Sequence, residues 1–137
     1  MDKTREEYLQ DFHTVFGAAI NAEPTVYLLH SRKTLIEEEV KELFAEIDTA
    51  IGYLEKGEET PRSVYQAMLK ELADVQVVIS GLSVALKPLY QKLENAFRLV
   101  HASNMSKMGE DGKPVVREDG KILKGPHYSP PDLSGLV

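Results

Sequence analysis

Two pairs of acidic residues lie inside helix-forming, apolar segments of this chain, and they limit how the chain can fold. The pairs are Glu39 with Glu42 and Glu71 with Asp74. In an α-helix, residues three or four positions apart lie on the same face, so the two members of each pair are neighbours. Apolar residues recur at helical spacing around both pairs, which places the carboxylates at the edge of a buried face. Burying like charges costs on the order of several kcal/mol unless something compensates them.

A divalent cation bound by carboxylate oxygens is the simplest compensation for such a cluster. A Glu-rich helix by itself is usually a solvated face, and Lys41 could pair with Glu37 or with neighbouring acids. The second segment argues for a metal, because Glu71 and Asp74 interrupt an otherwise apolar helix, where a solvated face is harder to arrange. The two segments together therefore predict a metal site.

Composition excludes several classes of function. The 137 residues predict a single domain with a sizeable core, and the net charge of -6 argues against binding nucleic acid through a basic surface. The absence of cysteine excludes disulfides, thiolate metal ligands and a cysteine nucleophile, and it fits a cytoplasmic location. No apolar run approaches membrane-spanning length, and the first residues contain no signal-peptide core. We therefore expect a cytoplasmic protein without a membrane or nucleic-acid partner.

The periodicity predicts an all-α fold, a bundle of about four helices. Thr4 and Glu7 form a predicted capping box for the first helix, and a long helix should run from about 26 to 56. Thr60 as N-cap and Pro61 as first helical residue should start a third helix, which continues to 86, and a last helix should cover about 89–106. The third helix is apolar nearly all round. It should therefore lie at the centre of the bundle or be covered by a partner subunit, and we expect a homodimer or homotetramer.

The composition changes after Met108. The segments 115–117 and 121–123 flank Asp119-Gly120, which predicts a small hairpin, and an extended Pro-rich segment follows. We expect residues 1–108 to form the helical catalytic part and residues 109–137 a tail of the same domain. The apolar residues of the tail should dock against the bundle or against a partner subunit.

The order Glu38-Glu39-x-x-Glu42, a long gap, then Glu71-x-x-Asp74 resembles the signature of the all-α nucleoside triphosphate pyrophosphohydrolases. That superfamily includes MazG, the dimeric dUTPases and phosphoribosyl-ATP pyrophosphohydrolase. The resemblance continues in the His-Ala-Ser-Asn-Met-Ser-Lys segment at 101–107, in Asp-Gly-Lys-Ile-Leu-Lys-Gly-Pro at 119–126 and in Pro-Pro-Asp at 130–132. The chain is most similar to single-domain MazG-like proteins of bacteria and their phages.

The resemblance implies an enzyme that cleaves the bond between the α and β phosphates of an NTP or dNTP, giving a monophosphate and pyrophosphate. It implies Mg²⁺, with Mn²⁺ as a substitute, and it assigns Glu38 to orienting or deprotonating the attacking water. The implied metal ligands are Glu39, Glu42, Glu71 and Asp74. Phosphoryl transfer needs neutralised charge and in-line positioning more than a covalent nucleophile, which agrees with this set of residues.

Four residues nearer the C-terminus are candidate substrate contacts. Asn104 and Lys107 lie one turn apart at a predicted helix end, where an amide can read a base or sugar edge and an ammonium can meet a phosphate. Capping of the last helix carbonyls is the alternative role for Lys107. Lys121 and Lys124 are candidate phosphate contacts from the tail.

Three other functions compete with this interpretation. A phosphoribosyl-ATP pyrophosphohydrolase would share the acidic signature. A di-iron carboxylate bundle would need Glu-x-x-His on paired helices, and Glu71-x-x-Asp74 has aspartate at the histidine position. A non-catalytic helical interaction module would carry the same acids as a solvated surface.

Overall fold

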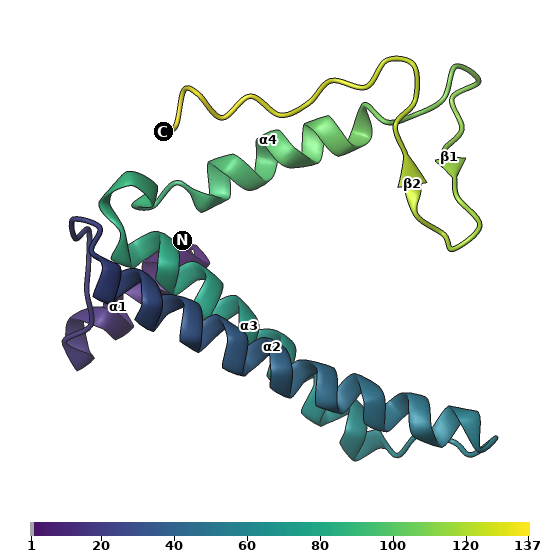
Figure 1. The fold of residues 1–137 in the computed structure, drawn as a ribbon, viewed down its shortest axis with the longest axis horizontal. Helices are drawn as coiled ribbons and strands as arrows, with labels where there is room; N and C mark the ends of the chain where they lie inside the picture. Colours follow the sequence, from purple (N-terminus) through teal and green to yellow (C-terminus); the bar gives the residue numbers. More distant parts are fainter. Residues whose placement is uncertain (1) are drawn as a thin grey trace. The chain divides into compact units, whose positions relative to one another are not determined.

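The computed structural model describes residues 2–137, which fall into two compact units, the first ending at Gln91 and the second spanning Lys92–Val137. The described chain contains four α-helices and one two-stranded antiparallel hairpin, so the predicted all-α class is confirmed (Figure 1). The last helix groups with the tail and not with the three helices before it. No helix in residues 2–137 has the length and apolar character needed to cross a membrane.

The first helix, α1, spans Arg5–Phe16 and is fixed by local interactions at both ends. The Thr4 hydroxyl accepts a hydrogen bond from the Glu7 amide while the Glu7 carboxylate accepts one from the Thr4 amide, which is the predicted capping box. Gly17 ends the helix in the left-handed region, with φ of 71°. The backbone conformation of this helix end is therefore one that glycine adopts without strain.

Helices α2, Val26–Glu55, and α3, Arg62–Ala85, form a long antiparallel pair (Figure 1). Thr25 caps α2 by accepting a hydrogen bond from the Leu28 amide at 3.0 Å. Helix α3 begins one residue later than predicted. Pro61 occupies the N-cap position and makes no side-chain capping bond, so the expected role of Thr60 as N-cap is wrong.

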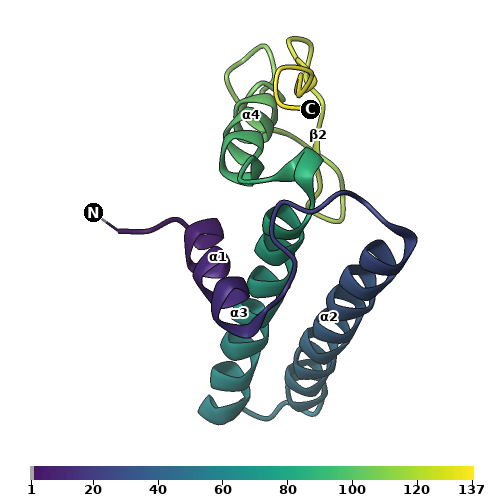
Figure 2. The same ribbon diagram turned by 90° about the vertical axis from the view of Figure 1, so that its left-hand side faces the viewer.

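Helix α3 is the common support of the first unit, because α1 and α2 each pack against it and hardly against each other (Figure 2). The loop between α1 and α2 is tied to the end of α3 by hydrogen bonds from Asn21 N to Val84 O and from Ala22 N to Ala85 O, both 2.8 Å. Most of the apolar core lies near this end of α3, and its buried members are Leu9, Ala50, Val78, Val84, Ala85 and Leu86.

The second unit begins with α4, Leu93–Met105, which starts later than predicted. A short 3₁₀ turn at Lys87–Leu89 and a left-handed Gln91, with φ of 57°, interrupt the chain before it. The predicted hairpin is confirmed as β1, Val115–Val116, and β2, Ile122–Leu123. The tail then runs back along α4, where the Ser103 hydroxyl donates to Ser129 O at 2.7 Å.

Candidate metal centre

The structure brings the four predicted metal ligands together on the α2–α3 pair. Helix α2 supplies Glu39 and Glu42, and α3 supplies Glu71 and Asp74. One oxygen from each carboxylate can be chosen so that all four lie within 4.8 Å of one another. Four oxygens at this separation surround a volume suited to one hard divalent cation.

The burial of these carboxylates supports a site built for a cation. Glu71 is only 9% exposed, Glu39 and Asp74 are partly buried, and Glu42 is open to solvent. Glu39 Oε2 and Glu71 Oε2 are buried and have no hydrogen-bond partner. A buried acceptor without a partner loses its hydration and gains nothing in return, at a cost of about 1–3 kcal/mol or more for a charged group. Coordination to a cation would satisfy both oxygens, so the donor set fits a hard metal ion.

The position of Glu39 in the cluster disfavours its ionised form. Partial burial raises the pKa of Glu39, and the charges of Glu42, Asp74 and Glu71 raise it further, with a hydrogen bond to Glu42 acting in the same direction. Ionisation of Glu39 therefore lowers the stability of the folded protein when no cation is bound. A bound divalent cation would reverse this preference by favouring the ionised carboxylate.

Lys70 is a member of the site that the sequence interpretation missed. Its Nζ lies 2.7 Å from Asp74 Oδ2 and 3.3 Å from Glu71 Oε1. These two contacts raise the pKa of Lys70, first through hydrogen bonding and then through charge. The i,i+4 spacing of Lys70 and Asp74 was the signal that could have revealed the pair. One exposed ammonium group neutralises only part of the charge of four carboxylates, which leaves room for a cation.

Glu38 lies beside the cluster and outside it. Its side chain is exposed, and it stands one helical turn before Glu42, the most open of the four carboxylates. Glu38 can therefore meet a water molecule that approaches the cluster from the solvent side. The solvated-face alternative allowed Lys41 to pair with Glu37, but the Glu37 carboxylate lies 3.6 Å from Lys33 Nζ.

Three of the four candidate substrate contacts share one cavity of the second unit. Asn104, Lys107 and Lys121 line a cavity of about 530 Å³ whose other walls are apolar: Met105, Met108, Pro114 and Ile122. A cavity with apolar walls and a few polar groups is the usual form of a small-molecule site. Lys124 lies elsewhere, with its Nζ 4.9 Å from the centre of the Tyr128 ring.

The glycine at position 125 allows the tail to approach the end of α4. A Cβ at this position would collide with the backbone carbonyls of Met108 and Lys107. The close approach holds the tail against the same residues that line the cavity. The shape of the cavity therefore depends on Gly125 although this residue does not line it.

Compared with models of known protein families and with curated proteins, the chain matches none. The assignment of chemistry to the two groups of residues therefore depends on their geometry and on the motif resemblance.

Proposed function

We propose that this protein is a MazG-like, Mg²⁺-dependent nucleotide pyrophosphohydrolase, which converts an NTP or dNTP to the monophosphate and pyrophosphate. One observation carries the proposal. Four carboxylates from two helices converge, and two of their buried oxygens, on Glu39 and Glu71, have no partner. A solvated acidic face would leave no carboxylate oxygen buried and unpaired, so the observation weighs against a non-catalytic helical module.

The four carboxylates would hold Mg²⁺, or Mn²⁺ in its place, and the cation would neutralise charge on the phosphates and polarise them. Lys70 holds the Asp74 and Glu71 carboxylates on the α3 side of the cluster. Glu38 orients a water molecule for attack on the α-phosphorus and accepts a proton from it. The cavity bearing Asn104, Lys107 and Lys121 supplies an amide for a base or sugar edge and two ammonium groups for phosphates. Lys124 remains a further candidate for a phosphate contact.

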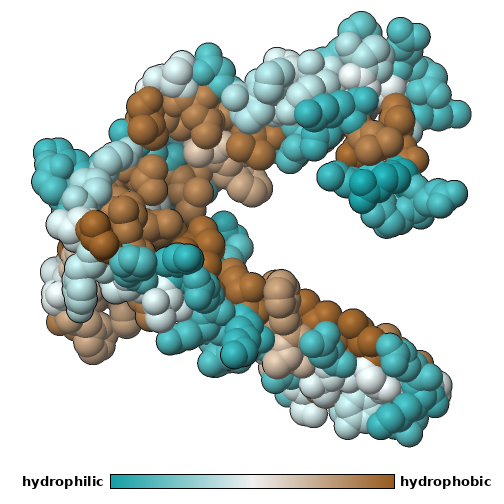
Figure 3. Space-filling view, viewed as in Figure 1, coloured by the Kyte–Doolittle hydropathy of each residue, from teal (hydrophilic) through white to brown (hydrophobic). Residues whose placement is uncertain are grey.

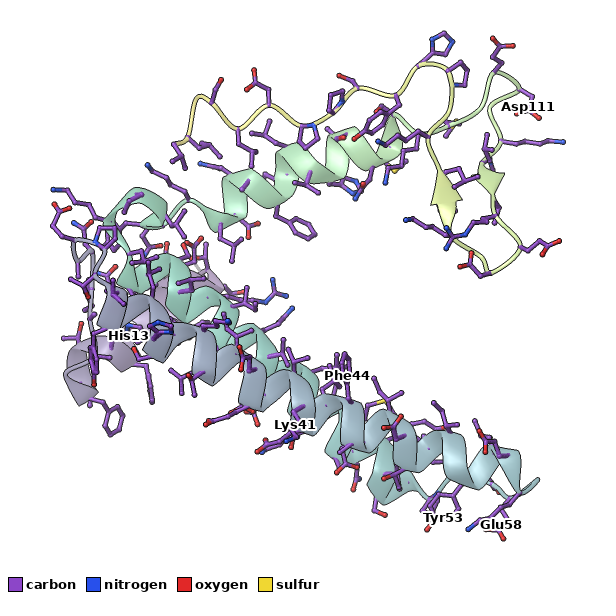
Figure 4. The ribbon with its side chains drawn as sticks, viewed as in Figure 1. His13, Lys41, Phe44, Tyr53, Glu58 and Asp111 are labelled. Atoms are coloured by element: carbon purple, nitrogen blue, oxygen red, sulfur yellow. The ribbon has the colours of Figure 1, made fainter. Side chains whose placement is uncertain are left out.

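The proposed enzyme is a homodimer or homotetramer. Large apolar side chains are exposed along the α2–α3 pair (Figure 3), among them Phe44 at 58%, Leu54 at 60% and Leu69 at 69%. Phe44 points away from the pair on the side opposite Lys41 (Figure 4). Exposed apolar residues gathered on one surface are typical of an association site.

Sedimentation velocity at micromolar concentration should show a dimer or tetramer, and a stable monomer would contradict this part of the proposal.

Product analysis tests the proposed reaction. Purified protein with Mg²⁺ is incubated with a panel of NTPs and dNTPs and with phosphoribosyl-ATP, and the products are separated by ion-exchange chromatography. We expect a monophosphate and intact pyrophosphate, because the sequence contains an acidic metal cluster and no Gly-rich phosphate loop of the P-loop type. A diphosphate and orthophosphate as main products would rule the mechanism out, and phosphoribosyl-ATP as the only substrate would favour the nearest enzymatic alternative.

A further inference from the structure

Arg32, on α2, is a buried cation without a counter-charge. Arg32 is only 8% exposed, and its Nε has no hydrogen-bond partner. None of the ion pairs among residues 2–137 involves Arg32. Burial lowers the pKa of its guanidinium, and no nearby acid opposes that effect. A buried charge without a partner is strongly destabilising. A purely structural role does not explain such a cost.

The space that Arg32 occupies is made by Gly81 of α3. A Cβ at Gly81 would collide with Arg32 Nη2 and would lie 3.3 Å from His13 Nε2. Any larger residue at this position would displace the guanidinium. Glycine lowers helix stability relative to alanine, so its presence within α3 needs a packing or functional reason.

His13 of α1 lies beside the same point of α3 as Arg32 and supplies no negative charge. The residue is 2% exposed, and its Nδ1 lies 2.7 Å from Ala19 O, a carbonyl that only accepts. Nδ1 therefore carries the proton of the neutral ring. Burial lowers the pKa of His13, and the charge of Arg32 lowers it further although the Ala19 hydrogen bond opposes this. Glu6, the buried acid of α1, accepts a hydrogen bond from the Ser83 hydroxyl.

The position of Arg32 relates it to the carboxylate cluster. Arg32 precedes Glu39 by two helical turns on α2, and Gly81 follows Asp74 by two turns on α3, so both lie on the same face as the cluster. Two turns correspond to a separation of roughly 10 Å. One phosphoryl group cannot meet both sites at this distance, whereas separate groups of one polyphosphate can.

We propose that Arg32, seated over Gly81 and beside His13, is an anion subsite that binds a phosphoryl group of the nucleotide away from the metal cluster. The fork of donors on arginine matches phosphate oxygens, and a buried setting strengthens the charge-assisted hydrogen bonds. The unpaired charge is then a binding group held ready for its ligand. The nature of the ligand follows from the proposed function, but the binding of an anion by Arg32 requires neither a metal ion nor turnover.

The test compares wild type with Arg32→Met, using inorganic phosphate as the probe in metal-free buffer. Phosphate should raise the melting temperature of wild type and should shift the imidazole resonances of His13, while His30, His101 and His127 move little. Arg32→Met should lose both responses and bind phosphate at least about 10-fold more weakly, because it removes a charge-assisted bidentate contact. Without phosphate, Arg32→Met should melt at a higher temperature than wild type, since it replaces an unpaired buried charge by an apolar group of similar length.

Lys33→Met is the matched control, because it removes a neighbouring positive charge whose side chain is 72% exposed. It should leave the phosphate response unchanged. Arg32→Lys keeps the positive charge but loses the bidentate geometry of the guanidinium, so it should retain a weakened response to phosphate. This variant keeps the proposal testable if Arg32→Met does not fold. Glu71→Gln should keep the response to phosphate while losing the response to Mg²⁺, so the subsite and the proposed function can fail separately.

Three results would overturn the subsite. Wild type could show no phosphate response, or Arg32→Met could respond as wild type does. Arg32→Met could also melt at a lower temperature with a changed association state, which would assign Arg32 to an interface between subunits.

With Mg²⁺ present, tripolyphosphate should bind Arg32→Met at least about 10-fold more weakly than wild type, and equal binding would place the polyphosphate elsewhere.

Discussion

Replacing Glu71 by glutamine should abolish Mg²⁺ binding and nucleotide hydrolysis together while leaving the fold intact. Glu71 is the most buried of the four clustered carboxylates, and its Oε2 has no hydrogen-bond partner. Glutamine keeps the shape of the side chain and removes its charge. Because outer partners of metal ligands alone are worth about 10–100-fold in affinity, loss of a direct ligand should weaken Mg²⁺ binding by at least about 100-fold. Calorimetric titration with Mg²⁺ and the rate of pyrophosphate release measure the two effects.

The thermal stability of metal-free Glu71→Gln tests the repulsion within the cluster independently of catalysis. Removing one of several close carboxylates relieves repulsion, so the melting temperature without a cation should equal or exceed that of wild type. Wild type should be stabilised by Mg²⁺, and the variant should not be. Glu46→Gln, on α2 outside the cluster, should behave as wild type in every measurement. Unchanged Mg²⁺ affinity in Glu71→Gln would remove the metal site from the proposal.

Glu38→Gln should slow turnover while leaving Mg²⁺ affinity and KM close to those of wild type. Glu38 is exposed and lies outside the four-carboxylate cluster, so its loss should change stability by no more than about 0.5 kcal/mol. General-base groups contribute about 10²–10⁴-fold to rate, and this is the expected fall in kcat. A group that acts only in the transition state lowers kcat and kcat/KM together. Steady-state kinetics over a range of nucleotide concentrations measure both constants.

Glu37→Gln is the control for Glu38→Gln, because it removes an adjacent exposed carboxylate that pairs with Lys33. It should retain full turnover. Full turnover by Glu38→Gln would remove Glu38 from the mechanism and leave the hydrolase proposal standing. A loss of Mg²⁺ affinity in Glu38→Gln would assign the residue to the metal site instead.

Features that depend on neighbours in the sequence could be predicted from the sequence alone. The capping box of Thr4 and Glu7 and the hairpin around Asp119-Gly120 involve residues within a few positions of each other. The pairing of Glu39 with Glu42, and of Glu71 with Asp74, follows from helical periodicity in the same way. Such features need no knowledge of the tertiary structure, because a few backbone dihedral angles determine them.

Helix starts were predicted less well, because they depend on single backbone angles. The left-handed conformation of Gln91 delays α4, and the extended conformation of Pro61 makes it a cap and not the first residue of α3. Propensity does not distinguish these alternatives at the level of one residue.

The tertiary structure decided everything that depends on the register of α2 against α3. That register places the carboxylates of Glu39 and Glu71 in one cluster and buries an oxygen of each without a partner. It also sets Arg32 opposite Gly81, where an arginine is buried without a counter-charge. Sequence patterns show which residues share a face of one helix, but not which face of another helix packs against them. Side-chain packing between distant segments fixes that choice, and both proposed sites follow from it.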